Sequence, residues 1–161
     1  MKIVSFEANN GMRLGVVEGD NVIDLQAVDA SVPGDLGEYL RAHNGDLKPL
    51  AALAAKAPAS ARHPLAGLKF ALPVARPGKI ICLGLNYLDH VKEGPQKDNI
   101  PKFQSIFFRV LTSFTPHLQP LMRPKKSIQL DYEAEMVVII GQRAKHLTLD
   151  NATDCVAGYT C

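Results

Sequence analysis

The sequence has few of the features that mark secreted, membrane or disulfide-stabilised proteins. Its three cysteines, Cys82, Cys155 and Cys161, form neither a CxxC pair nor a zinc-binding pattern. This spacing is typical of reduced thiols in the cytosol. No hydrophobic run approaches the roughly 20 residues of a membrane helix. Glu7 precedes any long apolar stretch, so no secretory signal is recognisable. We therefore expect a soluble cytoplasmic protein.

Excess charge and nucleotide-binding motifs are also missing. With 18 basic and 16 acidic side chains the net charge is only +2, which argues against general electrostatic binding to nucleic acid. The basic cluster at 123–126 lacks neighbouring aromatics, and a solvated loop is favoured there over a phosphate contact. GxGxxG, Walker and GxSxG motifs are absent, so nucleotide binding and serine-hydrolase chemistry are not supported. We expect neither nucleic acid nor a membrane as partner.

The first part of the chain reads as a small α/β domain. Strands are expected over residues 2–7, 13–18 and 22–25, with a turn at 9–11. Apolar spacing predicts helices over 35–43, with Asp35 as N-cap, and over 47–57. Prolines between 58 and 77 then interrupt any periodicity and mark a domain boundary. We place the N-terminal domain at residues 1–72.

The second part, residues 73–161, has a different character. A buried strand is expected over 79–84 and another strand over 105–110. A third is expected over 130–140, with its apolar second half buried, and a further strand begins at 157. Helices are expected over 86–93, with Asn86 as N-cap, and over 148–156, while 94–104 reads as a mobile loop. The predicted fold class is therefore α+β.

Two carboxylates, Glu133 and Glu135, stand at i and i+2 on the predicted strand 130–140. Alternate strand residues share a face, roughly 6.5–7 Å apart, so the two charges repel and are costly to desolvate. Either a cation between them or exposure to water resolves this conflict. Hard oxygen ligands favour Mg²⁺, Mn²⁺ or Ca²⁺ over zinc, and a third ligand would be needed. The spacing alone does not distinguish a metal site from two carboxylates exposed to water.

His90 and Glu93 lie side by side on the predicted helix at i and i+3. A carboxylate raises the basicity of an imidazole and fixes its tautomer, which suits a general base acting through water. A surface pair without function is the common alternative. Arg109 at a strand end is either a carboxylate clamp or a snorkelling edge residue. No catalytic role is expected for the remaining histidines: His43, His63, His117 and His146.

Five stretches in series resemble the fumarylacetoacetate hydrolase family. They are residues 79–90 with Glu93, 107–109 with Ser113, 130–135, 140–141 and 156–160. They occur in the family's order and extend over residues 79–161, while the first 72 residues look like its variable N-terminal domain. The resemblance implies that residues 73–161 form part of a mixed β-roll, usually assembled as a homodimer.

The resemblance also implies roles for single residues. Glu133 and Glu135 match the ligands of Mg²⁺, with Mn²⁺ or Ca²⁺ as alternatives. His90 and Glu93 match the pair that activates water, on a segment that closes over the substrate. Substrate contacts are implied for two more residues, Arg109 and Tyr159.

The implied activity is metal-dependent hydrolysis of a C–C bond in a small 2-oxo or 1,3-dioxo acid, such as an acylpyruvate or a fumarylacetoacetate-like compound. A metal chelated by the oxo acid would polarise a carbonyl and stabilise the developing enolate, while the base delivers water. The alternatives are a lyase, isomerase or decarboxylase on the same fold, or a non-catalytic interaction module.

Two departures from the family pattern bear on these expectations. Many members carry lysine where this chain has Arg109, which can hold a carboxylate in two hydrogen bonds but cannot donate a proton in the same way. The family's third metal ligand is an aspartate shortly after the Gly-Tyr-Thr stretch, and this sequence ends at Cys161. We therefore expect a catalytic domain that is incomplete at its C-terminus.

Overall fold

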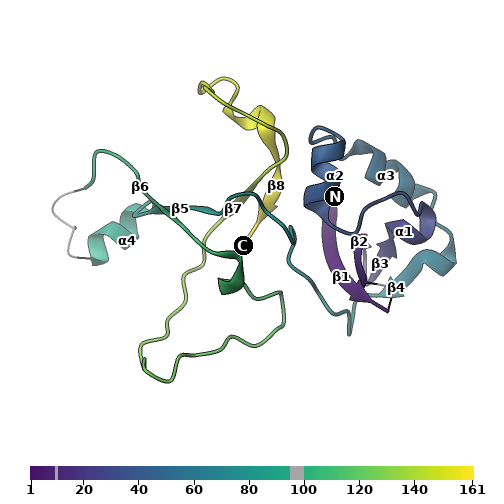
Figure 1. The fold of residues 1–161 in the computed structure, drawn as a ribbon, viewed down its shortest axis with the longest axis horizontal. Helices are drawn as coiled ribbons and strands as arrows, with labels where there is room; N and C mark the ends of the chain where they lie inside the picture. The colour runs from purple at the N-terminus through teal and green to yellow at the C-terminus, as the bar shows by residue number, and fades with distance from the viewer. Residues whose placement is uncertain (10, 95–99) are drawn as a thin grey trace. The chain divides into compact units, whose positions relative to one another are not determined.

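The computed structural model describes residues 1–9, 11–94 and 100–161 (Figure 1). Its contacts divide the chain into two compact units. The first unit combines Met1–Ala75 with Thr115–Cys161, and the second is Arg76–Phe114. The domain limits 1–72 and 73–161 stay a prediction.

The first unit begins with a four-stranded antiparallel sheet of order β1-β2-β3-β4. Its strands are β1 (Lys2–Ala8), β2 (Gly11–Glu18), β3 (Asn21–Asp24) and β4 (Arg62–Pro64). The first three strands confirm the prediction. β4 was not predicted, because three residues with two prolines nearby carry no readable periodicity. The predicted turn at 9–11 includes residue 10, which lies outside the described residues.

Three short helices follow β3 and contribute to the core of this unit: α1 (Leu25–Val28), α2 (Leu36–Ala42) and α3 (Lys48–Ala55). Side chains from β2, β3 and all three helices form one apolar cluster. Its most buried members are Leu14, Ile23, Leu25, Tyr39 and Leu50. Each such side chain contributes about 1.5–3 kcal/mol on burial.

None of the described helices is long and apolar enough to cross a membrane.

Asp24 ends β3 and starts α1. Its Oδ1 accepts hydrogen bonds from the backbone N–H groups of Gln26 at 3.0 Å and Ala27 at 3.2 Å. A side-chain acceptor of this kind supplies partners for the unpaired N–H groups of a first helical turn. The predicted strand 22–25 is therefore wrong at its last residue, since Leu25 is already helical.

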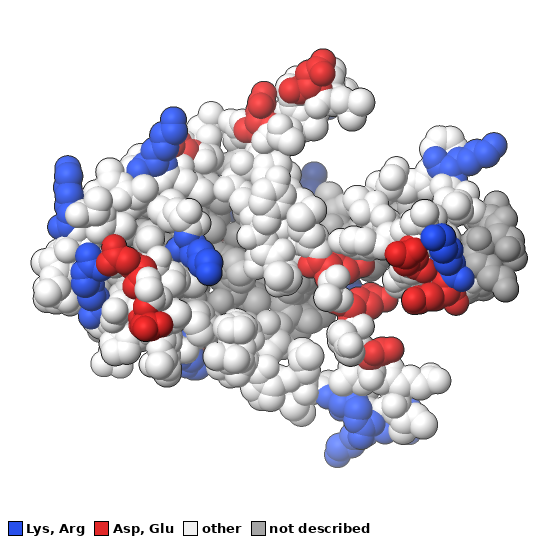
Figure 2. Space-filling view, turned by 180° about the vertical axis from the view of Figure 1, so that it is seen from behind, with Lys and Arg blue, Asp and Glu red and all other residues white. Residues whose placement is uncertain are grey.

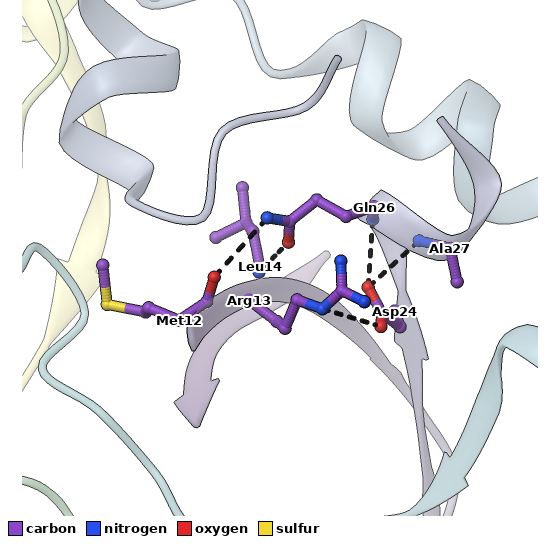
Figure 3. A network of polar contacts seen from close by, with 6 residues as sticks. All are labelled: Met12, Arg13, Leu14, Asp24, Gln26 and Ala27. Atoms are coloured by element: carbon purple, nitrogen blue, oxygen red, sulfur yellow. Dashed lines mark hydrogen bonds and ion pairs between the residues drawn. The ribbon is translucent and has the colours of Figure 1, made fainter. Parts of the chain in front are cut away.

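The same carboxylate joins a polar network that ties β2 to α1 (Figure 3). Asp24 Oδ2 lies 3.4 Å from Arg13 Nε. Gln26 Oε1 accepts from the backbone N–H of Leu14 at 2.9 Å, and its Nε2 donates to the carbonyl of Met12 at 3.5 Å. These contacts fix how α1 leaves the sheet.

Asp35 confirms the predicted cap of α2. Its Oδ1 accepts hydrogen bonds from the backbone N–H of Gly37 and from that of Ala75, both at 3.0 Å. The residue is only 3% exposed. One buried carboxylate thus starts α2 and also holds the last residue of the first segment of this unit.

The β-ribbon at the end of the chain also belongs to the first unit. β7 (Val137–Ile140) pairs antiparallel with β8 (Val156–Thr160). Ile139 and Ala157 pack against the core cluster. Gly141 approaches Gly45, whose φ is +81°, so closely that a Cβ on Gly45 would lie 3.2 Å from the Gly141 carbonyl carbon. Glycine at both positions permits this approach.

Two predictions for this region are corrected. The strand predicted over 130–140 is shortened to Val137–Ile140 and is mostly exposed. Within the described residues no strand lies opposite 131–136, and of the β7 side chains only Ile139 packs against the core cluster. The helix predicted over 148–156 is a single 3₁₀ turn, η3 (Ala152–Cys155), in which the Val156 N–H bonds to the Thr153 carbonyl three residues back. The strand predicted from residue 157 is confirmed.

The second unit contains β5 (Ile81–Gly84), α4 (Leu88–Glu93), β6 (Ser105–Phe108) and η2 (Leu111–Ser113). β5 and β6 form an antiparallel two-stranded ribbon. Both strands were predicted, but the burial predicted for β5 is wrong, since Ile81 is 54% exposed. Phe108 on β6 is 68% exposed. A two-stranded ribbon leaves apolar faces open unless another layer packs on it.

The predicted N-cap of the helix in this unit is wrong. α4 is preceded by Tyr87, in extended conformation and without a side-chain cap hydrogen bond. Asn86 therefore lies one residue too early to cap. Residues 95–99 of the predicted loop 94–104 lie outside the described residues.

Loss of the Asp35 carboxylate tests the role of this cap. We expect Asp35→Ala to lower the free energy of unfolding by about 2–4 kcal/mol, because it removes an N-cap and leaves two N–H groups without an acceptor. Urea denaturation followed by circular dichroism measures the change. Asp20→Ala, at an exposed turn position, is the matched control and should stay within about 0.5 kcal/mol of the parent. Equal losses in both variants would contradict the assignment.

Candidate functional site

His90 and Glu93 lie on the exposed face of α4 at i and i+3. We call this pair the α4 dyad. Val91 between them is 1% exposed and anchors the short helix. Lys92 forms an ion pair with Asp89 at 3.0 Å. Because residues three apart on a helix are neighbours, the imidazole and the carboxylate can act on the same molecule.

Arg109 follows β6 directly and is exposed. Its backbone N–H donates to the carbonyl of Ile80 at 3.2 Å. Its guanidinium carbon lies 5.6 Å from the centre of the Phe107 ring, a cation–π arrangement. The ring supports one face of the guanidinium, and its N–H edge stays available for a carboxylate.

Glu133 and Glu135 lie in the irregular stretch 131–136 that precedes β7, and both are exposed. The strand geometry expected for them is therefore not present. The neighbouring Asp131 accepts a hydrogen bond from the backbone N–H of Tyr132 at 2.8 Å. Exposure removes the desolvation cost that a buried pair of carboxylates would carry.

The donors present fit a hard divalent cation in kind but not in number. Carboxylate oxygens are the ligands that Mg²⁺ and Mn²⁺ prefer. Across residues 1–9, 11–94 and 100–161, no group of three or more His, Cys, Asp or Glu side chains is close enough to hold a metal. Two glutamates alone would therefore supply only part of a coordination shell.

Tyr159 lies on β8 opposite Val138 and is 62% exposed. It lines a pocket of about 400 Å³ together with residues of β1 and with Phe70 and His117. Sequence reasoning missed the other residues of this pocket, because they are distant in the chain and no local motif joins them.

The predicted site residues are divided between the two units. The α4 dyad and Arg109 belong to Arg76–Phe114, and both glutamates and Tyr159 belong to the first unit. Each unit thus carries its own part of the predicted chemistry: a base and a carboxylate-binding cation in one, metal donors and a hydroxyl in the other.

Charged side chains are spread over the surface. Figure 2 shows basic and acidic groups in small separate clusters on one face, with wide uncharged areas between them. This distribution agrees with the net charge of +2.

The sequence was compared with curated proteins. At 34% identity, it matches "Oxaloacetate tautomerase fahd2, mitochondrial" of Xenopus laevis over 99% of this chain and 50% of that protein. Human "Oxaloacetate tautomerase FAHD2A, mitochondrial" is also 34% identical, over 99% of this chain and 51% of its own length. The chain spans about half the length of these curated relatives. Since their names place them in mitochondria, the cytoplasmic location stays a prediction.

Solved structures share the fold. The fumarylacetoacetate hydrolase of Exiguobacterium antarcticum matches with a TM-score of 0.69 and 29% identity, over 99% of this chain and 53% of that one. Maleylpyruvate hydrolase of Sphingobium sp. SYK-6, solved with manganese(II) and pyruvate, matches with a TM-score of 0.73 and 25% identity, over 99% and 56%. These neighbours confirm the predicted α+β class.

The second part of the chain, which contains all six predicted site residues, matches a protein-family model. That model is described as "Fumarylacetoacetate (FAA) hydrolase C-terminal", and the match extends over residues 79–161. This range begins where the first of the five sequence stretches begins and ends with the chain. The chain belongs to the fumarylacetoacetate hydrolase family.

Proposed function

We propose that this chain serves proton transfer at the carbon next to the oxo group of a small 2-oxo acid, interconverting its keto and enol forms. The observation that carries the proposal is the placement of His90 and Glu93 on one exposed helix face within the family segment. The names of the relatives at 34% identity support this reaction type, since they are called oxaloacetate tautomerases.

The α4 dyad supplies the base. A histidine changes its charge near neutral pH, so it can accept a proton from carbon and return it to carbon or oxygen. In this proposal Glu93, three residues further along the same exposed face, orients the ring. Val91, buried between them, limits rocking of the helix and so holds the base in place.

Arg109 binds the substrate carboxylate. Its guanidinium stays charged at all working pH values and can donate two parallel hydrogen bonds to a carboxylate. Stacking on Phe107 already restricts the Arg109 side chain, so less conformational entropy is lost when it binds a carboxylate. This role needs no proton donation, which arginine does not provide.

Glu133 and Glu135 would hold a divalent cation, Mg²⁺ or Mn²⁺. Such an ion, when bound, polarises the oxo group and stabilises enolate charge. The manganese(II) in the Sphingobium structure supports the choice of metal class. The chain's own contribution is two exposed carboxylates, whose negative charge attracts the cation.

Hydrolytic cleavage of a C–C bond in an acylpyruvate is the second candidate. Maleylpyruvate hydrolase, with a TM-score of 0.73, supports it. Here the α4 dyad would activate water, and the bond to the acyl carbon would break with release of an enolate. Lyase and decarboxylase chemistry remain further alternatives. Assembly as a homodimer is likewise a proposal.

A single NMR experiment separates these reactions. The chain is incubated in D₂O with MgCl₂ and either oxaloacetate or acetopyruvate, and proton spectra are followed against a protein-free blank. We expect faster deuterium exchange next to the oxo group with an unchanged carbon skeleton. Formation of two smaller acids would instead establish hydrolysis.

Substitution of the base tests its role. We expect His90→Gln to slow the exchange about 10²–10⁴-fold, the usual contribution of a positioned general base. His146→Gln, an exposed histidine of the first unit, is the matched control and should keep the parent rate. Identical rates for the parent and His90→Gln would refute the assignment of the base.

Metal affinity is predicted to be low. Because the two glutamates form only part of a coordination shell, we expect Mg²⁺ to bind this chain with a Kd of about 1 mM or weaker, at the weak end of carboxylate sites. Calorimetric titration measures it, with Glu133→Gln as the variant that should abolish residual binding. A micromolar Kd would show that further ligands complete the site.

A further inference from the structure

The pocket of about 400 Å³ beside Tyr159 lies wholly within the first unit. It is lined by strand β1 and β2 residues, by two residues that follow β4, and by two residues of the second chain segment. These are Met1, Lys2, Ile3, Val4, Val17, Leu65, Phe70, His117 and Tyr159. Its volume is within the range of small-molecule sites, about 300–1,000 Å³.

The pocket lining contains basic side chains but no acidic ones. Lys2 is a cation, His117 can become one, and no Asp or Glu is among the lining residues. The arginines of this sheet are already paired, Arg13 with Asp24 and Arg62 with Glu18. Lys69, which follows β4, pairs with Glu7 of β1. In the described part of the chain, no carboxylate pairs with Lys2. The pocket is therefore electrostatically suited to an anion.

Part of the pocket wall is apolar. Ile3 and Val4 come from β1, and Phe70 is tied to this sheet by a β-bridge to Phe6. The Phe70 ring meets the His117 ring edge to face, with centres 5.0 Å apart and planes at 71°. This contact orients the imidazole beside the apolar wall.

We propose that this pocket binds an organic carboxylate with a planar apolar body. The carboxylate lies against the Lys2 ammonium, with the His117 ring and the Tyr159 hydroxyl as further donors. The body packs on Phe70 and on Val4, which shares a face of β1 with Lys2. The site includes Tyr159, for which the family resemblance implies a substrate contact, but it requires neither the metal nor the α4 dyad.

Calorimetry with two matched probes tests the proposal, with EDTA present so that no metal contributes. Phenylacetate and phenylacetamide have the same body, and only the first is charged. We expect saturable binding of phenylacetate, with the amide and the Lys2→Met variant each about 10-fold weaker, as loss of a charge-assisted hydrogen bond implies. Lys145→Met, an exposed lysine outside the pocket, should bind like the parent.

Two results would overturn the proposal. One is no saturable binding of phenylacetate by the parent chain at millimolar concentration. The other is equal affinity of the parent and Lys2→Met for phenylacetate, with circular dichroism showing both folded. His117→Phe, which keeps an aromatic contact to Phe70, should weaken phenylacetate binding while leaving the amide unaffected.

Competition identifies the source of the carboxylate. Displacement of phenylacetate by pyruvate assigns the pocket to the 2-oxo acid of the proposed reaction. Unchanged binding in excess pyruvate assigns it to a separate carboxylate ligand. Because these measurements involve no turnover, a failure of the proposed enzymatic activity leaves their result intact.

Discussion

Two buried carboxylates, Asp24 and Asp35, determine where two helices of the first unit begin. Asp24 marks the change from β3 to α1, and Asp35 caps α2 and also binds the backbone N–H of Ala75. They are 4% and 3% exposed. A carboxylate buried this far is costly unless donors surround it. Asp24 accepts hydrogen bonds from two backbone N–H groups and pairs with Arg13. Asp35 Oδ1 accepts from the N–H groups of Gly37 and Ala75, while its buried Oδ2 has no hydrogen-bond partner among the described residues. α1 and α2 begin where these acceptors lie.

The packed core depends on that placement. α1, α2 and α3 each bury leucine against β2 and β3, and the β7–β8 ribbon adds Ile139 and Ala157 to the same cluster. The ribbon β5–β6 has the same kind of sequence but exposes Ile81, Phe107 and Phe108. Apolar side chains of similar type thus lie in a core in one unit and at the surface in the other. What covers a strand, and not its composition, makes this difference.

The proposed chemistry combines groups whose individual roles are simple. An exposed imidazole–carboxylate pair on α4 can move a proton, a guanidinium stacked on Phe107 can hold a carboxylate, and two glutamates can attract a hard cation. All of these groups lie within residues 79–161, the segment that matches the family model. The pocket beside Tyr159 adds a positively charged recess at the edge of β1.

The sequence by itself determined the family, the α+β class, the strands of the first sheet except β4, and the caps and helices that depend on local spacing, such as Asp35 and α2. These features follow from residues close together in the chain. Tertiary structure alone decided three others: the pairing of β4 with β3, the exposure of the strands at 81–84 and 137–140, and the meeting of Lys2, His117 and Tyr159 around one pocket. A local pattern states what a segment can bury or bind, and distant segments determine what lies against it.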